Sequence, residues 1–401
     1  MIAWTCEPDR GSEPGVGWEF ARGLARLASM DEETTAHLIT REDLADQITS
    51  ALDGLGLGQY LDVVPVRIPS AIMKATRRNR RWAYLYWMPR AVSRTKKIIS
   101  LTSESSNIVH HVTFATDSIP TFEWRLAGRA DIVFGPAGSS DTADRVGTVA
   151  SWRKSILSSF RNRMRHRNLR YVASPIAQNE HVIKAWAQLG IDAILEPAIF
   201  VEPSVQQHIL EVTARESNRI VFVGLLSPRK RVENILRALE LLPEDYQLLV
   251  VGDGSERRNL QILCESLGLG HRVEFTGKVP REEALQHIAG AQVLVNSSER
   301  EGAPWVVGEA QALGTVPVVV AGNGADTLVR MAGGVISPSA SATDLAAAIQ
   351  EARNSSLPPS SRWSTDRLPQ LLDSWYRHSA TENDPEDRRR AFVTDGDVHS
   401  T

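Results

Sequence analysis

Long apolar runs and closely spaced cysteines are missing from this 401-residue sequence. No stretch of eighteen apolar residues occurs, which excludes a transmembrane helix. The first residues, MIAWTCEPDRG, lack the basic start and apolar block of a signal peptide, so none is expected. The two cysteines, Cys6 and Cys264, stand far apart and outside any metal-ligand spacing. We therefore expect reduced thiols and a cytoplasmic location.

The composition is that of an ordinary globular protein, with 42% hydrophobic and 23% charged residues and a net charge of −3. A chain of this length exceeds what one hydrophobic core usually supports, so two domains are expected. No G-x-G-x-x-G follows the first apolar segment, which argues against an NAD-binding Rossmann protein.

The second half of the chain alternates short β-branched strands with helical periodicity. Strands are predicted at 219–226, 246–254, 272–277, 292–298 and 316–321, and helices at 232–242, 256–268, 281–291 and 304–313. The first half repeats this alternation less clearly, in IAWTC, HLITR, LDVVPV, NIVHHVTF, DIVFG and LRYVASP. Buried apolar strands separated by helices indicate parallel, doubly wound sheets.

The predicted fold is therefore α/β, with two Rossmann-like domains whose parallel sheets face a central cleft. We assign residues 1–198 to an N-terminal domain and residues 199–362 to a C-terminal domain. A helix at 363–378 is expected to pack back on the first domain, and the polar residues 379–401 to form a disordered tail. Such sheets bind ligands beyond the carboxyl ends of their strands.

Two of the three glutamates in SSEREGAPWVVGEAQALG, Glu301 and Glu309, flank an expected helix start. Pro304 suits the first helical position and Gly314 ends the helix. Glu301 is then on the loop and Glu309 inside the helix, on either side of free amides that attract phosphate. Two glutamates eight residues apart also arise by chance, so the pattern gains weight only from its context.

That context resembles the retaining GT-B glycosyltransferases of group 1, relatives of glycogen synthase and sucrose synthase. E-x7-E followed by A-x-A-x-G-x-x-P-V-V is the family's donor motif, and VGLLSPRKR (223–231) resembles its phosphate-binding segment. GSEPGVGW (11–18) resembles its N-terminal glycine loop. IVHHVTFAT (108–116) and VFGPAGSSD (133–141) resemble segments of one subgroup. These matches occur in family order along nearly the whole chain.

The resemblance implies that Glu301 binds hydroxyls of the donor sugar, Glu309 binds the ribose hydroxyls, and Lys230 neutralises the diphosphate. Either His110 or His111 is expected to hydrogen-bond the sugar near its reacting carbon, and the sequence leaves open which. The other implied donor contacts are the amides of Val306 and Val307, the nucleobase turn Gly277, Lys278 and Val279, the glycine loop Gly15 and Gly17, and the neighbouring cation Arg229.

Three positions depart from the family pattern. Leu225 stands where the family has a phosphate-contacting arginine, Val16 replaces a loop glycine, and Pro304 removes a backbone amide. These departures leave open an unusual donor or reduced activity, and Arg229 or Arg231 is the candidate to compensate for Leu225. No D-x-D motif is present at a strand end, so the resemblance implies a transferase without metal or cofactor, whose co-substrate is a UDP- or GDP-linked sugar.

The function implied by the resemblance is transfer of a hexose from a nucleotide sugar to a glycan or lipid-linked acceptor with retention of configuration. The resemblance also implies that residues 1–198 bind the acceptor and residues 199–362 bind the nucleotide sugar. Synthesis of cell-surface polysaccharide or glycolipid is the expected setting. Two alternatives stay open, a sugar-nucleotide epimerase on the same fold and a catalytically weakened protein that only binds the nucleotide sugar. No nucleic-acid partner is expected.

Residues 73–97 form a basic segment with nine lysines and arginines, four interleaved aromatics and no acidic residue. Such a composition is typical of segments that contact anionic membranes. A solvated basic helix whose aromatics pack on the domain core is the equally weighted alternative. The first interpretation predicts peripheral contact with the inner face of the membrane.

Overall fold

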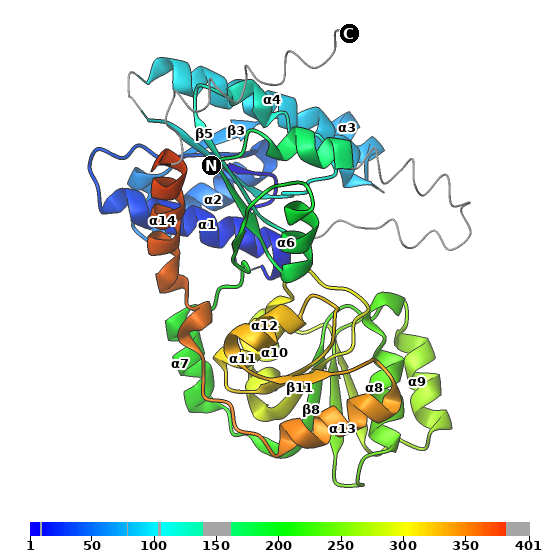
Figure 1. Ribbon diagram of the computed structural model, residues 1–401. Coiled ribbons are helices and arrows are strands. Elements are labelled where there is room, and N and C mark those ends of the chain that lie inside the picture. The colour runs from blue at the N-terminus through cyan, green and yellow to red at the C-terminus, as the bar shows by residue number, and fades with distance from the viewer. Residues whose placement is uncertain (9, 78, 103–105, 139–161, 382–401) are drawn as a thin grey trace, which may run out of the picture.

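The computed structural model describes residues 1–8, 10–77, 79–102, 106–138 and 162–381, and it contains two parallel sheets (Figure 1). The N-terminal sheet has seven strands in the spatial order β3 (Asp62–Val66), β2 (His37–Arg41), β1 (Ile2–Ala3), β4 (Ile108–Thr113), β5 (Asp131–Ala137), β6 (Ser174–Ala177) and β7 (Ile194–Leu195). The second sheet has six strands in the order β10 (Val273–Gly277), β9 (Gln247–Val251), β8 (Glu216–Val223), β11 (Ala291–Asn296), β12 (Val316–Val320) and β13 (Val335–Ser337). The predicted α/β fold with two parallel sheets is confirmed.

Helices connect successive strands of each sheet and cover its faces. The N-terminal helices are α1 (Ser12–Ser29), α2 (Glu42–Gly54), α3 (Ser70–Ala75), α4 (Arg80–Leu101) and α6 (Glu180–Ala187). The C-terminal helices are α7 (Pro203–Val212), α8 (Val232–Glu240), α9 (Arg257–Ser266), α10 (Arg281–Gly290), α11 (Trp305–Ala312), α12 (Asp326–Ala332) and α13 (Ala342–Arg353).

The last helix, α14 (Leu368–Thr381), returns to the N-terminal domain and packs beside α1 (Figure 1). It also contacts β5 and β6. Two short 3-10 turns, Ser361–Trp363 and Thr365–Arg367, occupy the first part of the predicted helix at 363–378. The predicted disorder is wrong for residues 379–381, which continue α14, and the rest of the predicted tail lies outside the described residues.

One apolar cluster continues from the N-terminal domain into the C-terminal domain. It includes Phe20 and Trp375 on one side and Val307 and Trp363 on the other. The indole of Trp363 donates to Gln311 Oε1 of α11 at 2.8 Å, so the buried polar edge of the ring is satisfied. Shared burial of this kind fixes the two domains against each other.

The local sequence explains the helices and the strand ends of the C-terminal domain well. Apolar residues of α8 recur at helical spacing, and Val232, Ile235, Leu236 and Leu239 are all buried. β8 and β9 end on glycines because their turns touch: a Cβ on Gly252 would lie 1.9 Å from the carbonyl oxygen of Gly224. Any side chain there would push these two strand ends apart.

The first half was predicted less accurately. The strand expected at LRYVASP begins only at Ser174, because residues 162–169 are helical and Leu169 packs in the core. The packing of Leu169 in a helix outweighs the strand preference of the nearby Val172. Among the described helices, none combines the length and the apolar character needed to cross a bilayer.

Candidate functional site

Glu301 lies in the loop between β11 and α11, at the carboxyl end of β11, as predicted. Asn323 holds this loop, because its carbonyl accepts the Glu301 amide at 2.6 Å. The Asn323 side chain donates to Asn296 Oδ1 and to the Ser298 carbonyl, at 3.3 and 3.1 Å. Glu301 is therefore a buried carboxylate on a loop that Asn323 holds through three hydrogen bonds.

Two cations contact the Glu301 carboxylate. Lys230 Nζ is 2.5 Å from Oε1, and Arg229 Nη1 is 3.3 Å from Oε2. Burial raises the pKa of Glu301, but Lys230 and Arg229 outweigh it, and the pKa lies below its ordinary value. The predicted sugar carboxylate and the predicted phosphate lysine therefore lie together at one strand end.

The backbone after β8 explains how Lys230 reaches this position. Pro228–Lys230 forms a 3-10 turn, and Arg231 has a left-handed φ of 49° before α8 begins. The Ser297 hydroxyl donates to the carbonyls of Lys230 and Arg231 at 2.8 and 3.0 Å. These contacts tie the turn to the loop that carries Glu301.

Glu309 lies inside α11 and is buried, with Arg281 Nη1 2.5 Å from its Oε1. Arg281 begins α10, and its guanidinium stacks 5.1 Å above the Trp305 ring. The sequence pattern did not single out Arg281. Its place at a helix start that follows a strand-ending turn is the signal that marks it.

The start of α11 differs slightly from the prediction. Pro304 is the residue before the helix and Trp305 the first helical one, with Val307 buried and Val306 half-buried. The Val307 amide already donates to the Pro304 carbonyl at 3.0 Å. A phosphate contact by that amide would replace this bond.

The predicted nucleobase turn follows β10. Gly277 has a φ of 79° and its carbonyl accepts the Gly252 amide at 2.8 Å. Lys278 is exposed and Val279 half-buried. Arg257, which sequence reasoning missed, donates to the Phe275 carbonyl at 3.3 Å beside this turn.

Leu225, which stands in place of the expected phosphate-contacting arginine, follows β8, and its side chain is 65% exposed.

The glycines Gly15 and Gly17 do not form a loop, and that prediction is wrong. Both lie in the first turns of α1. A Cβ on Gly15 would lie 2.1 Å from the Arg10 carbonyl oxygen, and one on Gly17 would lie 2.0 Å from that of Thr5. Here the missing side chains let α1 pack directly on the preceding backbone.

His110 and His111 point to opposite sides of β4, and both are fully buried. His110 Nε2 is 2.8 Å from the Gly135 carbonyl, and Nδ1 is 3.1 Å from the Tyr376 hydroxyl. Burial lowers the pKa of His110 to about 3, so the ring is neutral. Its Nε2 then donates and its Nδ1 accepts.

His111 has an acidic partner on the other face. Its Nδ1 lies 2.6 Å from Oε1 of the buried Glu123, and its Nε2 lies 3.1 Å from the Thr113 carbonyl. Three of the four ring nitrogens therefore have hydrogen-bond partners in the protein, and the fourth, Nδ1 of His111, is in ion-pair contact with Glu123. Hydrogen bonding to a donor sugar by either ring would require one of these partners to be exchanged.

The two domains meet at the loop of Glu301. Asn179, directly after β6, caps α6 with its side-chain oxygen and donates through Nδ2 to the Gly302 carbonyl at 2.9 Å. Glu180 lies 3.6 Å from Arg330 of α12. The carboxyl ends of β6 and β11 thus face each other at the interdomain boundary.

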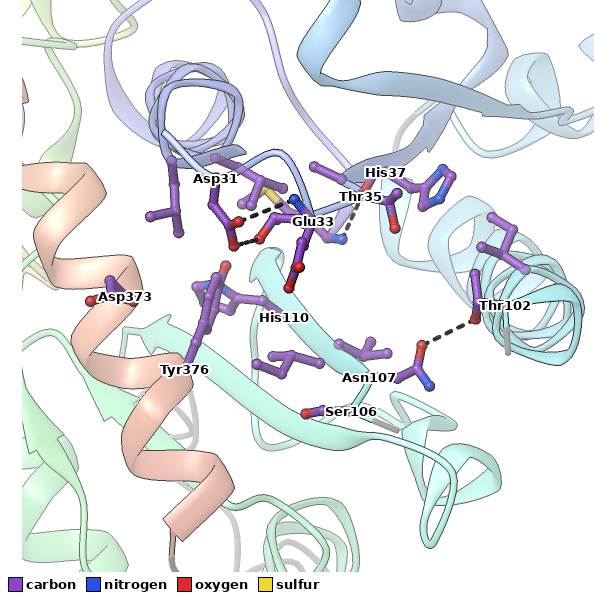
Figure 2. Close-up of a pocket in the computed structure, with 18 of the residues that line it drawn as sticks. Asp31, Glu33, Thr35, His37, Thr102, Ser106, Asn107, His110, Asp373 and Tyr376 are labelled. Atoms are coloured by element: carbon purple, nitrogen blue, oxygen red, sulfur yellow. Dashed lines mark hydrogen bonds between the residues drawn. The ribbon is translucent and has the colours of Figure 1, made fainter. Parts of the chain in front are cut away.

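A cavity of about 630 Å³ lies at the opposite edge of the N-terminal sheet (Figure 2). It is lined by the starts of β1, β2 and β4 and by α14, including Asp373 and Tyr376. The Met1 amino group borders the cavity and donates to the His37 carbonyl at 2.7 Å, and burial lowers the pKa of this amino group to about 5. His110 also lines this cavity, away from the carboxyl ends where Glu301 lies.

Residues 207–365 match the family model described as "Glycosyl transferases group 1". A D-inositol 3-phosphate glycosyltransferase of Xylanimonas cellulosilytica is 34% identical over 174 residues, which is 39% of this chain and 42% of that protein. The alignments with the first curated relatives cover between 26% and 42% of those proteins' length. Residues 207–365 are therefore similar in sequence to group 1 glycosyltransferases.

Solved structures are similar over nearly the whole chain. The Anabaena protein HepE in complex with UDP has a TM-score of 0.58 and 16% identity, covering 93% of this chain and 98% of that one. WaaG, a glycosyltransferase involved in lipopolysaccharide biosynthesis, has a TM-score of 0.53 and 16% identity, covering 96% of each chain. Together with the two parallel sheets, these similarities show that the fold is GT-B.

Proposed function

We propose that this protein transfers a hexose from a UDP- or GDP-linked sugar to a glycan or lipid-linked acceptor, with retention of anomeric configuration. One observation carries the proposal. A buried carboxylate, Glu301, is held between Lys230 and Arg229 at the carboxyl end of β11, beside the start of α11. Cations and a helix start together suit a diphosphate, and the carboxylate suits sugar hydroxyls.

In this proposal the donor exchanges partners with the protein. The diphosphate takes over Lys230, and the freed Glu301 carboxylate accepts from hydroxyls of the sugar. Glu309, which Arg281 now holds at 2.5 Å, accepts from the ribose hydroxyls. The departing phosphate oxygen takes the acceptor's proton on the same face, so the protein mainly positions groups and stabilises charge.

The first test is a thermal-shift panel of UDP, GDP and ADP with their sugars. A ligand at one hundred times its dissociation constant stabilises a protein by about 2.7 kcal/mol, which is easily measured. Stabilisation by one nucleotide and more by its sugar supports the proposal. No shift with any of them would contradict it.

Product analysis then separates the three functions that share the fold. A mass increase of an acceptor by one hexose identifies a transferase, and the anomeric proton coupling of the product reports retention. Conversion of the free nucleotide sugar into its epimer identifies an epimerase. Tight binding without transfer or hydrolysis identifies a binding protein, which the exposed Leu225 in place of a phosphate-binding arginine would favour.

The roles of the two glutamates are tested by paired variants. Glu309→Gln should weaken nucleotide-sugar binding by about 1.5–3 kcal/mol, because it loses a charge-assisted hydrogen bond. Glu301→Gln should lower turnover more than affinity for the free nucleotide, because it addresses the sugar. Calorimetry with UDP and with UDP-glucose distinguishes them, and equal losses of UDP affinity would show that the roles are misassigned.

Transfer should not depend on a divalent metal. In the described part of the chain, no three histidine, cysteine, aspartate or glutamate side chains gather as a metal-binding group. Lys230 and the α11 start are the proposed source of positive charge. Activity after exhaustive EDTA treatment should equal the untreated rate, whereas loss that Mg²⁺ or Mn²⁺ restores would contradict this part of the proposal.

The basic segment, residues 73–97, is proposed to hold the protein peripherally on an anionic membrane at the cytoplasmic face. Lys74, Arg81, Arg94 and Lys97 are exposed, and Trp82 is 65% exposed. Tyr84 and Trp87, by contrast, pack in the core against Trp4. The aromatic contribution to membrane contact therefore rests on Trp82 rather than on all four rings.

Co-sedimentation with phosphatidylglycerol vesicles at low and high salt tests this contact. Binding should weaken as the salt concentration rises and strengthen as the anionic lipid content rises. Trp82→Ala should weaken it further, while Trp124→Ala, at another exposed tryptophan, serves as the control. Equal and negligible binding to anionic and neutral vesicles would return the segment to ordinary surface.

A further inference from the structure

The N-terminal domain presents one carboxylate toward the proposed donor site that the sequence patterns did not single out. Glu13 is the second residue of α1 and lies between Gly11 and Gly15, two glycines that face the C-terminal domain. A Cβ on Gly11 would lie 3.3 Å from Arg281 Nη1, and one on Gly15 would lie 3.0 Å from the Trp305 ring. Glu13 is therefore on the backbone that contacts the starts of α10 and α11.

The Glu13 carboxylate is fixed in place by the end of β4. Its Oε1 accepts the backbone amide of Phe114, the first residue after the strand. A second bond, from the Thr5 amide to Thr113 Oγ1 at 3.0 Å, holds the preceding loop to the same strand end. Within the described chain Oε2 makes no hydrogen bond or ion pair, so this oxygen is free for a ligand.

The backbone on both sides of this contact is strained. Four non-glycine residues of the described chain have left-handed φ values, namely Ser12 at 62°, Phe114 at 57°, Phe122 at 62° and Arg231 at 49°. Ser12 precedes Glu13, Phe114 donates to it, and Arg231 follows Lys230. Such residues concentrate at functional sites, where the fold maintains an otherwise unfavourable geometry.

A buried acid–base pair supports the Glu13 contact from below. His111 and Glu123, 2.6 Å apart, lie at the base of the same strand end, and Phe122 immediately precedes Glu123. His111 also holds the Thr113 carbonyl, one residue before Phe114. Burial raises the pKa of Glu13, and the Phe114 amide and His111 lower it in part. Glu13 is solvent-exposed yet closely surrounded by protein.

We propose that Glu13 is the acceptor-binding carboxylate of the N-terminal domain, whose free Oε2 accepts a hydrogen bond from the acceptor's reacting hydroxyl. The inference rests on the proposed transferase function. The acceptor class it implies is a polyol, such as a sugar or a cyclitol, with a hydroxyl free to point across the domain boundary. His111 and Glu123 are positioning residues, because they act through the strand end that holds Glu13.

The test separates acceptor from donor. The probes are the nucleotide sugar chosen by thermal shift, and methyl glucosides and D-inositol 3-phosphate as acceptors. Release of the nucleoside diphosphate is also measured without acceptor, where water takes the acceptor's place. Glu13→Gln should lower kcat/KM for acceptor, or the hydrolysis rate, about 10- to 100-fold. The dissociation constant of the donor should change less than about twofold.

Two controls complete the design. Glu7→Gln, in the same loop and paired with Arg10 at 3.4 Å, should leave both quantities unchanged. In Glu13→Ala, added formate should restore part of the rate, which a purely structural role would not allow. An active wild type with an unaffected Glu13→Gln variant, or with a parallel loss of donor affinity, overturns the role of Glu13 alone. A wild type that neither binds nor turns over any nucleotide sugar overturns the proposed function, and the acceptor role with it.

Discussion

The two domains use polar residues at their strand ends in different ways. In the C-terminal domain, Glu301 and Glu309 are each held by a cation, Lys230 and Arg281, at 2.5 Å. A charged ligand can take over such a partner with little cost in geometry. In the N-terminal domain, the histidines His110 and His111 are enclosed by fixed partners on both faces of β4.

This difference separates residues that hold a ligand from residues that hold the fold. The C-terminal carboxylates lie on a loop and a helix start that reach the domain boundary. The N-terminal histidines and Gly17 lie behind that boundary, where they join α1 and α14 to the sheet. Substitutions in the first set should change binding, and those in the second set should change stability.

The largest expected effect is in the N-terminal set. Gly17→Ala puts a methyl group 2.0 Å from the Thr5 carbonyl oxygen, so α1 must move away from the loop. Overpacking against backbone should lower the free energy of unfolding by about 3 kcal/mol, more than the helix propensity of alanine returns. Urea denaturation measures it.

Gly54→Ala is the matched control for this change. Gly54 ends α2, and nothing lies within 4 Å of a Cβ built there. The same substitution should therefore stabilise the protein by about 0.5–1 kcal/mol. Equal effects at the two glycines would show that the close contact under α1 is unimportant.

Next in size is Lys230→Met in the C-terminal set. Loss of the cation beside Glu301 should weaken binding of the nucleoside diphosphate by about 2 kcal/mol, because a charge-assisted hydrogen bond to phosphate disappears. Calorimetry gives the dissociation constant. Lys184→Met, on the exposed surface of α6, is the control and should leave it unchanged. Unaltered affinity in Lys230→Met would place the diphosphate elsewhere.

A pH-dependent effect distinguishes His110 from a ligand-binding histidine. Its pKa is about 3 in the fold and about 6.5 when unfolded, so the unfolded state binds more protons between these values. Stability from a neutral His110 is present above pH 6.5 and decreases as the pH falls. Between pH 7 and pH 5 the loss should be about 2 kcal/mol.

Comparison of the wild type with His110→Gln isolates the contribution of His110 to the pH dependence of stability, because all other titrating groups, including the Met1 amine, are common to both. Urea midpoints at pH 7, 6 and 5 should converge as the pH falls. Parallel pH profiles of the two proteins would show that His110 is accessible to protons in the folded state.

The smallest expected effect is a gain. Leu225→Arg restores the cation that the family places after this strand, and the side chain is 65% exposed, so an arginine fits. Nucleoside diphosphate binding should strengthen by about 1 kcal/mol, roughly fivefold. Leu241→Arg, 54% exposed at the end of α8, adds the same charge elsewhere and should have no effect.

The sequence by itself determined the strand–helix alternation, the two parallel sheets and the positions of Glu301 on a loop and Glu309 in a helix. These features depend on local periodicity and on nearby proline and glycine, which short-range sequence records directly. The helices and strands of the C-terminal domain were predicted accurately for this reason. The strand predicted at LRYVASP was wrong at its start, because the packing of Leu169 in a helix depends on distant residues.

Only the tertiary structure decided which polar groups meet. The pairs Arg281 and Glu309, Glu123 and His111, and Phe114 and Glu13 are separated by 12 to 101 positions in the sequence. The same holds for Gly15 and Gly17, whose motif resembles a loop but whose close backbone neighbours make them part of a helix. Contacts of this kind arise from the way strands and helices pack in three dimensions. No local sequence pattern identifies which two residues will form such a pair.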